Sequence, residues 1–244
     1  MRVYSASDIG LVRSSNQDCC NTGEFPDGSV FAVVCDGMGG ANGGCTASSV
    51  ATETISQRLL ELYRPDMNDE ETREIMELAV SDANLKVYDM AQNDSFLYGM
   101  GTTVVCAVVR GTALYVVHAG DSRAYLFEDG TLRRLTTDHS MVQELVSAGQ
   151  ITEEQARQHP NRNIITRALG VDAYLATDYN RAELGAGSLL LICTDGLSGY
   201  FSDGQLCSMI AQTPDDMLAE ELIKAAKAQG GSDNITVAVI SQRQ

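Results

Sequence analysis

The chain has 244 residues, of which 44% are hydrophobic and 20% are charged, and its formal net charge is -16. This length allows one large domain or two small ones, and the apolar content is sufficient for a sizeable core. Because no basic stripe offsets the acidic surface, we expect no binding to nucleic acid. No segment has the pattern of a signal peptide or the apolar length of a membrane span, so we expect a cytoplasmic protein that does not enter the membrane.

The number and spacing of the cysteines also indicate a cytoplasmic protein. There are 7 of them, an odd number, and none forms a C-x-x-C motif. Cys35, Cys106 and Cys193 lie within apolar runs, where a thiol behaves as a small core residue. We therefore expect reduced cysteines rather than a disulfide framework.

Helical periodicity is clearest in two stretches. Apolar residues recur at helical spacing from Ala47 to Leu62, after a glycine-rich turn, and again from Ile75 to Met90. Asn68 and Glu71 resemble a capping pair that begins the second of these helices. Further along the chain the pattern predicts strands at 102–109, 113–119 and 123–127 joined by hairpin turns. A helical patch at 140–148, a capping box at 152–155 and a loop at 160–163 follow. The chain is then expected to form a strand at 188–194, a helix of about fifteen residues from 213, and a last strand.

This order of elements indicates the architecture. Two long helices followed by hairpins favour antiparallel sheets with helices packed outside them, rather than a regular alternation of strand and helix. The sequence contains no low-complexity tract, internal repeat or flexible linker. We therefore expect a single domain that spans residues 1–244.

Acidic residues recur where the apolar runs begin or end. Asp36, Asp121 and Asp195 each follow such a run, and Asp233 comes just before the last one. One aspartate beside a glycine is commonly a turn residue, but several at the ends of buried strands can meet at one edge of a sheet. Their charges then repel one another and call for a cation. Oxygen ligands with almost no histidine suit Mg²⁺ or Mn²⁺ better than Zn²⁺.

The glycine-rich turn at Asp36-Gly37-Met38-Gly39-Gly40 allows another interpretation, a dinucleotide-binding loop. That fingerprint requires G-x-G-x-x-G, and here the final position is Asn42. The glycines instead let the backbone approach a bound group closely, and a carbonyl at this turn can itself be a metal ligand.

Eight motifs in fixed order resemble the PPM family, the metal-dependent type-2C Ser/Thr protein phosphatases, and in particular its compact bacterial members. The resemblance extends from about residue 4 to residue 240, which makes it specific. The motifs are Arg13-x-x-Asn16-Gln17-Asp18, Asp36-Gly37-Met38-Gly39-Gly40, Gly101-Thr102-Thr103, Gly120-Asp121-Ser122-Arg123, Asp138-His139-Ser140, Ala168-Leu169-Gly170, Thr194-Asp195-Gly196-Leu197 and Gly231-x-Asp233-Asn234-x-Thr236.

The resemblance implies an α+β fold, a central β-sandwich of two antiparallel sheets flanked by helices on both sides. It implies two tightly bound Mn²⁺ or Mg²⁺ ions and a third, weaker one. One ion is held by Asp36, Asp195 and Asp233, the second by Asp18, Asp36 and the carbonyl of Gly37, and the third by Asp121 with Asp195. It also implies that Arg13 binds the substrate phosphate and that residues 141–182 form a flap beside the site.

The implied activity is hydrolysis of phosphoserine and phosphothreonine monoesters by a water that bridges two metal ions. In this interpretation Asp36, Asp195, Asp233 and Arg13 are the catalytic residues. Two cations lower the pKa of a bridging water, and the planar fork of arginine matches phosphate oxygens. The implied partners are phosphorylated proteins that a cognate Ser/Thr kinase modifies, and we expect a monomer.

The chain departs from the family pattern beside the site. Ala41 stands where many bacterial members have histidine, Cys45 replaces a common glutamate, and Met38 replaces the histidine proposed as general acid in eukaryotic members. We therefore assign no side chain as proton donor to the leaving oxygen, and a water held by the metals is the simplest hypothesis.

None of the three histidines is expected to take part in the chemistry. We predict that His118 is a core or edge residue of a strand, that His139 is structural, and that His159 lies in a surface loop.

Two other functions remain open from the sequence. A binding module that has lost its chemistry is disfavoured because Asp18, Asp36, Asp195 and Asp233 are all retained. An enzyme acting on another phosphoester, such as a small molecule or a phosphorylated anti-sigma-factor antagonist, is a third alternative, because the metal centre recognises phosphate rather than the group attached to it.

Overall fold

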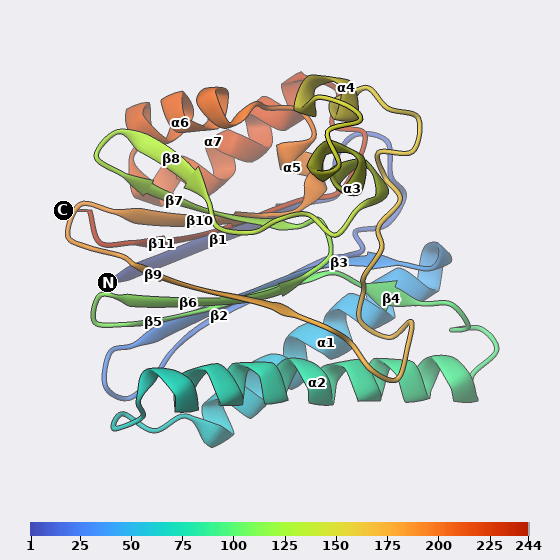
Figure 1. The fold of residues 1–244 in the computed structure, drawn as a ribbon, viewed down its shortest axis with the longest axis horizontal. Coiled ribbons are helices and arrows are strands. Elements are labelled where there is room, and N and C mark those ends of the chain that lie inside the picture. Colours follow the sequence, from blue (N-terminus) through green and yellow to red (C-terminus); the bar gives the residue numbers. More distant parts are fainter. Residues whose placement is uncertain (244) are drawn as a thin grey trace.

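The computed structural model describes residues 1–243, apart from the side chains of residues 41 and 42, and consists of two antiparallel β-sheets packed face to face between pairs of helices (Figure 1). The five-stranded sheet has the order β1 (Arg2–Asp8), β11 (Ile235–Ser241), β10 (Leu189–Cys193), β7 (Arg123–Glu128) and β8 (Thr131–Arg134). The other sheet has the order β2 (Asp18–Glu24), β3 (Val30–Met38), β5 (Val104–Arg110), β6 (Ala113–Ala119) and β9 (Asp178–Glu183), with the short β4 (Gly101–Thr102) paired to β3.

Helices cover the outer face of each sheet. In Figure 1, α1 (Gly40–Leu62) and α2 (Asp69–Asn93) lie below the sheet that contains β3, and α6 (Asp203–Gln212) and α7 (Asp215–Ala228) lie above the five-stranded sheet. Both faces of the central strands are therefore buried, which explains why their sequences are apolar without interruption. In β3, Ala32 and Val34 face the other sheet, whereas Phe31, Val33 and Cys35 pack against α1 and α2.

The structure confirms the predicted α+β sandwich and its main elements. The helices predicted at 47–62 and 68–90 are α1 and α2, and the helix predicted from 213 is α7. The hairpin turns are also found, and Asp129 and Gly130, between β7 and β8, both have positive φ angles of 49° and 73°. Such a two-residue turn matches the right-handed twist of the strands that it joins.

Several elements were not predicted from the sequence: β1, β2, β8, β9, α5 (Asp195–Ser198) and α6. The two outer strands of the sheet that contains β3 are β2, with the sequence DCCNTGE, and β9, with the sequence DYNRAE. Both are partly exposed and lack an apolar run, because an edge strand with one open side tolerates polar residues. Their pairing is set by their neighbours in the sheet rather than by their own sequence.

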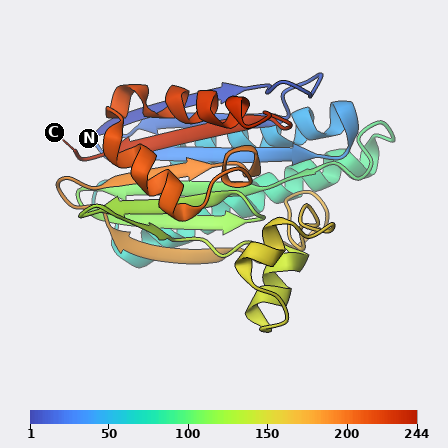
Figure 2. The same cartoon turned by 90° about the horizontal axis from the view of Figure 1, so that it is seen from above.

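Residues 141–177 contain no strand of either sheet, although Leu169 makes an isolated bridge to Thr102 of β4. They contain α3 (Met141–Ser147) and α4 (Glu153–Arg157), which project from the body of the molecule in Figure 2. The flap expected at 141–182 therefore extends into β9, a strand of the sheet, and the segment outside the sheets ends at 177. We refer to residues 141–177 as the flap segment.

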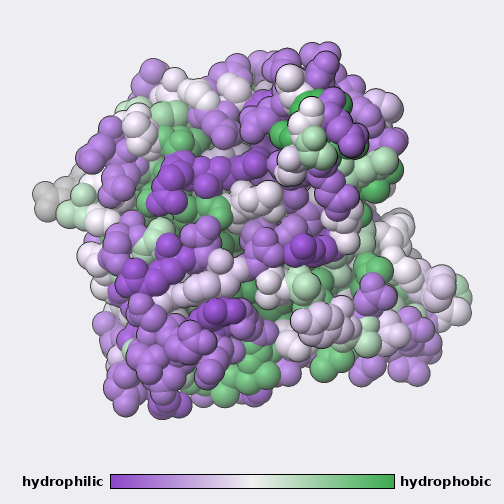
Figure 3. Space-filling view, viewed as in Figure 1, coloured by the Kyte–Doolittle hydropathy of each residue, from purple (hydrophilic) through white to green (hydrophobic). Residues whose placement is uncertain are grey.

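The surface is mainly polar. The face in Figure 3 is covered mainly by hydrophilic residues, shown in purple, with only scattered apolar ones. Among the described residues, no helix is both long and apolar enough to cross a membrane.

A capping box begins α2, as predicted. The Glu71 amide donates to Asn68 Oδ1 at 3.0 Å, and the Asn68 amide donates to Glu71 Oε2 at 2.8 Å. We expect Asn68→Ala to lower the free energy of unfolding by about 1 kcal/mol, the usual value of such a cap. Urea unfolding measures this loss, and Asn68→Ser, which keeps a capping oxygen, is the matched control. Equal stability of the two variants would contradict the role of the cap.

Candidate metal centre

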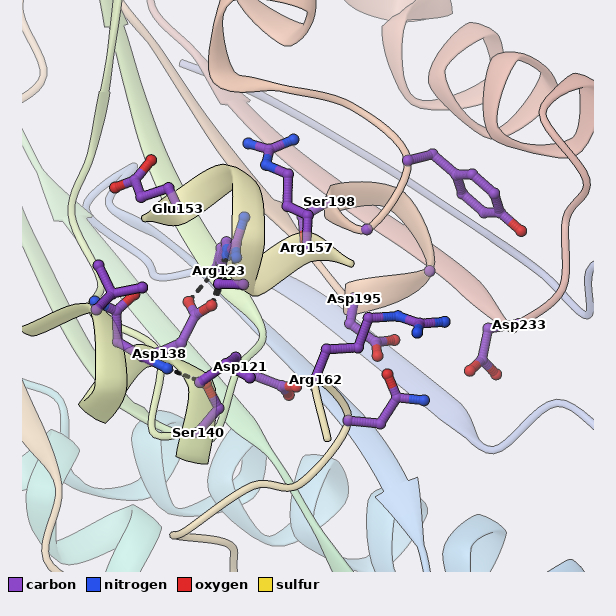
Figure 4. A pocket seen from close by; sticks show the side chains of 18 of the residues that line it. Asp121, Arg123, Asp138, Ser140, Glu153, Arg157, Arg162, Asp195, Ser198 and Asp233 are labelled. Atoms are coloured by element: carbon purple, nitrogen blue, oxygen red, sulfur yellow. Dashed lines mark hydrogen bonds and ion pairs between the residues drawn. The ribbon is translucent and has the colours of Figure 1, made fainter. Parts of the chain in front are cut away.

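The predicted acidic residues converge at one end of the sandwich. Asp18 is the first residue of β2 and lies directly opposite Asp36 of β3 in the strand register. Asp195 is the first residue of α5 (Asp195–Ser198), immediately after β10, and Asp233 lies just before β11. Asp121 follows β6, and Figure 4 shows it on the same side of a cavity as Asp195. Residues from both sheets thus form one cluster of carboxylates.

Glycine is required where β3 meets α1. A Cβ atom on Gly37 would lie 2.1 Å from the carbonyl oxygen of Gly44 and 2.7 Å from that of Gln17. No larger residue fits between these backbones. The Gly37 amide donates to the Gln17 carbonyl at 3.0 Å, so the turn that carries the predicted carbonyl ligand is fixed against the chain that leads to Asp18.

Burial and mutual repulsion raise the pKa of four carboxyl groups. Desolvation is the largest cause in each case, followed by neighbouring acids for Asp36, Asp121 and Asp195. The pKa of Asp36 rises well above its usual range because Asp18, Asp195, Asp121 and Asp233 all act on it. Burial raises the pKa of Asp18 to about 7, although hydrogen bonds from Thr236 and Thr194 oppose the shift. The cluster therefore favours binding either protons or cations.

Two oxygens of the cluster lack the partners that buried acceptors normally have. Asp18 Oδ1 and Asp195 Oδ1 are buried and accept no hydrogen bond within the described part of the chain, whereas Asp18 Oδ2 accepts one from Thr194 at 2.9 Å. An unpaired buried carboxylate oxygen is costly unless something coordinates it. An all-oxygen donor set of this kind fits Mg²⁺ or Mn²⁺.

The predicted ligands are close enough to interact but are not drawn tightly together. Across residues 1–243, the one group of three His, Cys, Asp or Glu residues whose ligand atoms all lie within 4.8 Å of one another is His118, His139 and Asp178. Asp233 is instead turned toward Arg13, whose Nη2 donates to Asp233 Oδ2 at 2.7 Å.

Arg13 lies at the rim of the cluster with its side chain 50% exposed. The loop that carries it is held by the buried Asn234, which donates to the carbonyls of Ile9 and Ser15 and accepts from the Gln17 amide. The guanidinium is thus placed next to the acids while part of it stays open to solvent. This position suits an arginine that binds an anion arriving from outside.

A cavity of about 210 Å³ separates the acids from the flap segment. Asp121, Asp195 and Asp233 line one side, and Arg157 and Arg162 line the side formed by the flap segment (Figure 4). Arg123 is bound to Asp138 by a bidentate ion pair, but no ion pair involves Arg157 or Arg162 among the residues that the structure describes. These two cations are therefore available to an acidic ligand.

Several supporting residues were not assigned a role from the sequence. Thr103 Oγ1 accepts from the Asp36 amide at 2.9 Å, and Thr194 and Asn234 hold Asp18 and the Arg13 loop. Each was present in a motif beside a predicted ligand, and that proximity was the only available signal. Of the residues that depart from the family pattern, Met38 ends β3 and Cys45 lies in α1, whereas the Ala41 side chain lies outside the described residues.

The histidines lie where the sequence analysis placed them. His118 is buried in β6 with 3% of its surface exposed, as predicted, and His139 is buried after β8 with 7% exposed. His159 is partly exposed in the turn after α4.

Comparison with known proteins identifies the class. A family model described as protein phosphatase 2C matches residues 12–231. The serine/threonine phosphatase stp of Listeria welshimeri is 33% identical over 243 residues, which cover 99% of this chain and 96% of that protein. A serine/threonine phosphatase structure from S. agalactiae has a TM-score of 0.91 at 34% identity and covers 98% of both chains. The catalytic domain of PstP in complex with 2 manganese ions has a TM-score of 0.85 at 33% identity, over 98% of this chain and 96% of that one.

The chain belongs to the protein phosphatase 2C family, the PPM phosphatases. It is a serine/threonine protein phosphatase, which confirms the resemblance on which the sequence analysis relied.

The raised pKa of Asp18 has a consequence for stability. Because its pKa is about 7 in the folded protein and near 3.8 when unfolded, the folded state binds the proton more tightly. The contribution of Asp18 protonation to the free energy of unfolding is complete below pH 3.8 and is lost as the pH rises through 7. In chelator, we expect Asp18→Asn to gain stability over the parent between pH 4 and 8, by about 1.4 kcal/mol for each tenfold difference in proton affinity.

Urea unfolding at several pH values measures this difference. Asp66→Asn, at a carboxylate whose side chain is 86% exposed, is the control and should parallel the parent protein. If the curves of Asp18→Asn and the parent were parallel, the carboxyl of Asp18 would not have a raised pKa.

Proposed function

We propose that this phosphatase holds two divalent cations, Mn²⁺ or Mg²⁺, at the cluster of carboxylates. Asp36, Asp195 and Asp233 would hold one, and Asp18, Asp36 and the Gly37 carbonyl the other. Asp121 with Asp195 would hold a third, weaker ion. The buried, unpaired oxygens of Asp18 and Asp195 are the observation that carries this proposal. The manganese in the PstP catalytic domain supports it.

When bound, such a pair of cations lowers the pKa of a water molecule toward neutrality and neutralises charge on the phosphate. The protein's own residues then have distinct tasks. Arg13 binds the phosphate oxygens with donors that Asp233 leaves unused, since Asp233 contacts one of its nitrogens. Asp233 in turn fixes the direction of the guanidinium.

In the overall reaction, water oxygen forms a bond to phosphorus as the bond to the serine or threonine oxygen breaks. The attacking water gives up one proton and the leaving oxygen takes up one; no side chain is assigned as the donor, and a water held at the cations would supply it. The cavity between the acids and the flap segment is placed to receive the residues around the phosphoserine or phosphothreonine (Figure 4). Arg157 and Arg162 would complement acidic groups there.

We infer that the substrates are phosphorylated proteins and that a cognate Ser/Thr kinase produces them. We also propose that the enzyme acts as a monomer in the cytoplasm. Within residues 1–243 no disulfide joins the cysteines, which fits a reducing compartment.

The bridging role of Asp36 can be tested directly. Asp36→Asn should abolish Mn²⁺-dependent hydrolysis of an aryl phosphate, because the neutral amide cannot offset the charge of two cations. Calorimetric titration should show loss of tight Mn²⁺ binding, and circular dichroism should show an unchanged fold. Asp66→Asn is the control for loss of an exposed carboxylate. Activity retained by Asp36→Asn would refute the bridging role.

The role of Arg13 predicts a different kinetic signature. Arg13→Ala should raise the KM for a phosphopeptide by about ten- to a hundredfold, because a hydrogen bond to a charged group contributes about 1.5–3 kcal/mol. Arg13→Lys should recover part of this loss, since it keeps the charge but not the planar fork. A KM that is the same in all three proteins would remove Arg13 from the phosphate site.

A further inference from the structure

A pair of stacked histidines connects the flap segment with the metal centre. His118 of β6 lies directly opposite Asp178 of β9 in the strand register. The rings of His118 and His139 stack with their centroids 4.7 Å apart and their planes 10° from parallel. His139 is also 3.3 Å from Asp178, measured from Nε2 to Oδ2.

On one side, His139 holds the turn that carries Asp121. The Gly120 amide donates to His139 Nδ1 at 3.2 Å, and the His139 amide donates to the Gly120 carbonyl at 2.9 Å. Both backbone polar groups of Gly120 are therefore bound by one residue. Gly120 has a φ of +108°, and a Cβ atom there would lie 2.6 Å from the Thr103 side chain, so the position requires glycine. The turn is therefore held through the Gly120 backbone rather than through a side chain.

The same turn is linked to Asp36. Ser122 Oγ and Thr103 Oγ1 are hydrogen-bonded at 2.8 Å, and Thr103 Oγ1 accepts from the Asp36 amide at 2.9 Å. A displacement of the Gly120–Ser122 turn would therefore shift the backbone at Asp36 as well as Asp121.

On its other side, His139 contacts the end of the flap segment. Because Nδ1 accepts the Gly120 amide, the proton of the neutral ring is on Nε2, which faces Asp178. The His139 carbonyl accepts from the Thr166 amide at 2.8 Å. Arg167 donates to Asp178 Oδ1 at 2.8 Å. His139 thus contacts both the flap segment and the Asp121 turn directly.

The spacing of His118, His139 and Asp178 is also compatible with a further metal site. Two features oppose it. Nε2 of His139 carries the proton in the observed hydrogen-bonding pattern, and the Arg167 guanidinium lies 3.2 Å from it, so a cation would meet a fixed positive charge. The contacts favour a hydrogen-bonded connection.

We propose that His139, oriented by Asp178, is a positioning residue that couples the flap segment to divalent cation binding at Asp121. Occupation of the cation site at Asp121 fixes the Gly120–Asp121 turn and, through the His139 ring and Asp178, the end of the flap segment at Arg167. Conversely, loosening the Asp178 contact weakens the hold of the flap segment on that turn. This inference rests on the proposed assignment of Asp121 as a metal ligand.

Two substitutions separate the two sides of the ring. His139→Asn places an amide oxygen near the position of Nδ1, so it can accept from Gly120 but cannot reach Asp178. His139→Gln places its amide near Nε2 and leaves the Gly120 amide without an acceptor. Asp178→Asn, at a side chain that is 48% exposed, removes the carboxylate with little risk to folding.

The measurements are Mn²⁺ titration by calorimetry and hydrogen–deuterium exchange of residues 160–170 with and without Mn²⁺. In the parent protein, Mn²⁺ should slow exchange in this segment. His139→Gln should weaken the Asp121-dependent binding step by about tenfold. His139→Asn and Asp178→Asn should keep that binding within about threefold but lose the slowing of exchange.

Asp121→Ala separates this inference from the assignment on which it rests. If this variant binds every Mn²⁺ ion as the parent does, the assignment of Asp121 is wrong. If it loses the weak ion while exchange at 160–170 still slows on adding Mn²⁺, the assignment stands and the coupling is refuted. Zn²⁺ binding that His118→Asn abolishes would replace the proposal with a metal site at the histidines.

Discussion

The burial of like charges at one end of the sandwich is the constraint on which the site depends. Desolvation and mutual repulsion both act against ionised carboxylates there, and they raise the pKa of Asp18, Asp36, Asp121 and Asp195 together. The surrounding hydroxyl groups relieve only part of this, since Asp18 and Asp195 each retain an oxygen without a partner. The same repulsion and desolvation therefore raise the affinity of the cluster for cations and lower the stability of this end of the fold when no cation is bound.

Such a cluster requires a scaffold that cannot move apart to relieve the repulsion. The strand β3, which carries Asp36, and the strand β10, which ends just before Asp195, are packed on both faces, by the other sheet and by a layer of helices (Figure 1). Their apolar residues fix the strand ends, and the contact of Gly37 with the Gly44 and Gln17 carbonyls fixes the turn beyond β3. Much of the core thus holds acids at separations that they would not otherwise adopt.

The parts that were predictable from the sequence follow from this packing. Strands buried on both faces leave apolar runs, so β3 and β10, and the acids at their ends, could be read directly. Asp18 has no such signal, because β2 is a partly exposed edge strand without an apolar run, and its assignment to a particular metal ion came from the resemblance to a family. The contacts of Thr103, Asn234 and His139 join residues far apart in the chain, and no local pattern specifies such a register.

The two sides of the cavity are built differently, and this difference bears on how the enzyme can vary. Arg13 and the acids are tied to strand ends of the two sheets, so changes there disturb the core. The part of the flap segment that contains α3 and α4 lies outside both sheets and projects from them (Figure 2). It can therefore change in sequence, and with it the residues that meet a substrate, without affecting the carboxylates. There are two exceptions. At His139, the backbone carbonyl accepts from the Thr166 amide and the ring accepts from the Gly120 amide. At Leu169, the backbone pairs with Thr102, which lies opposite Gly37 in the strand register. A change at either junction reaches the metal centre, so these are the points where substrate handling and cation binding can influence each other.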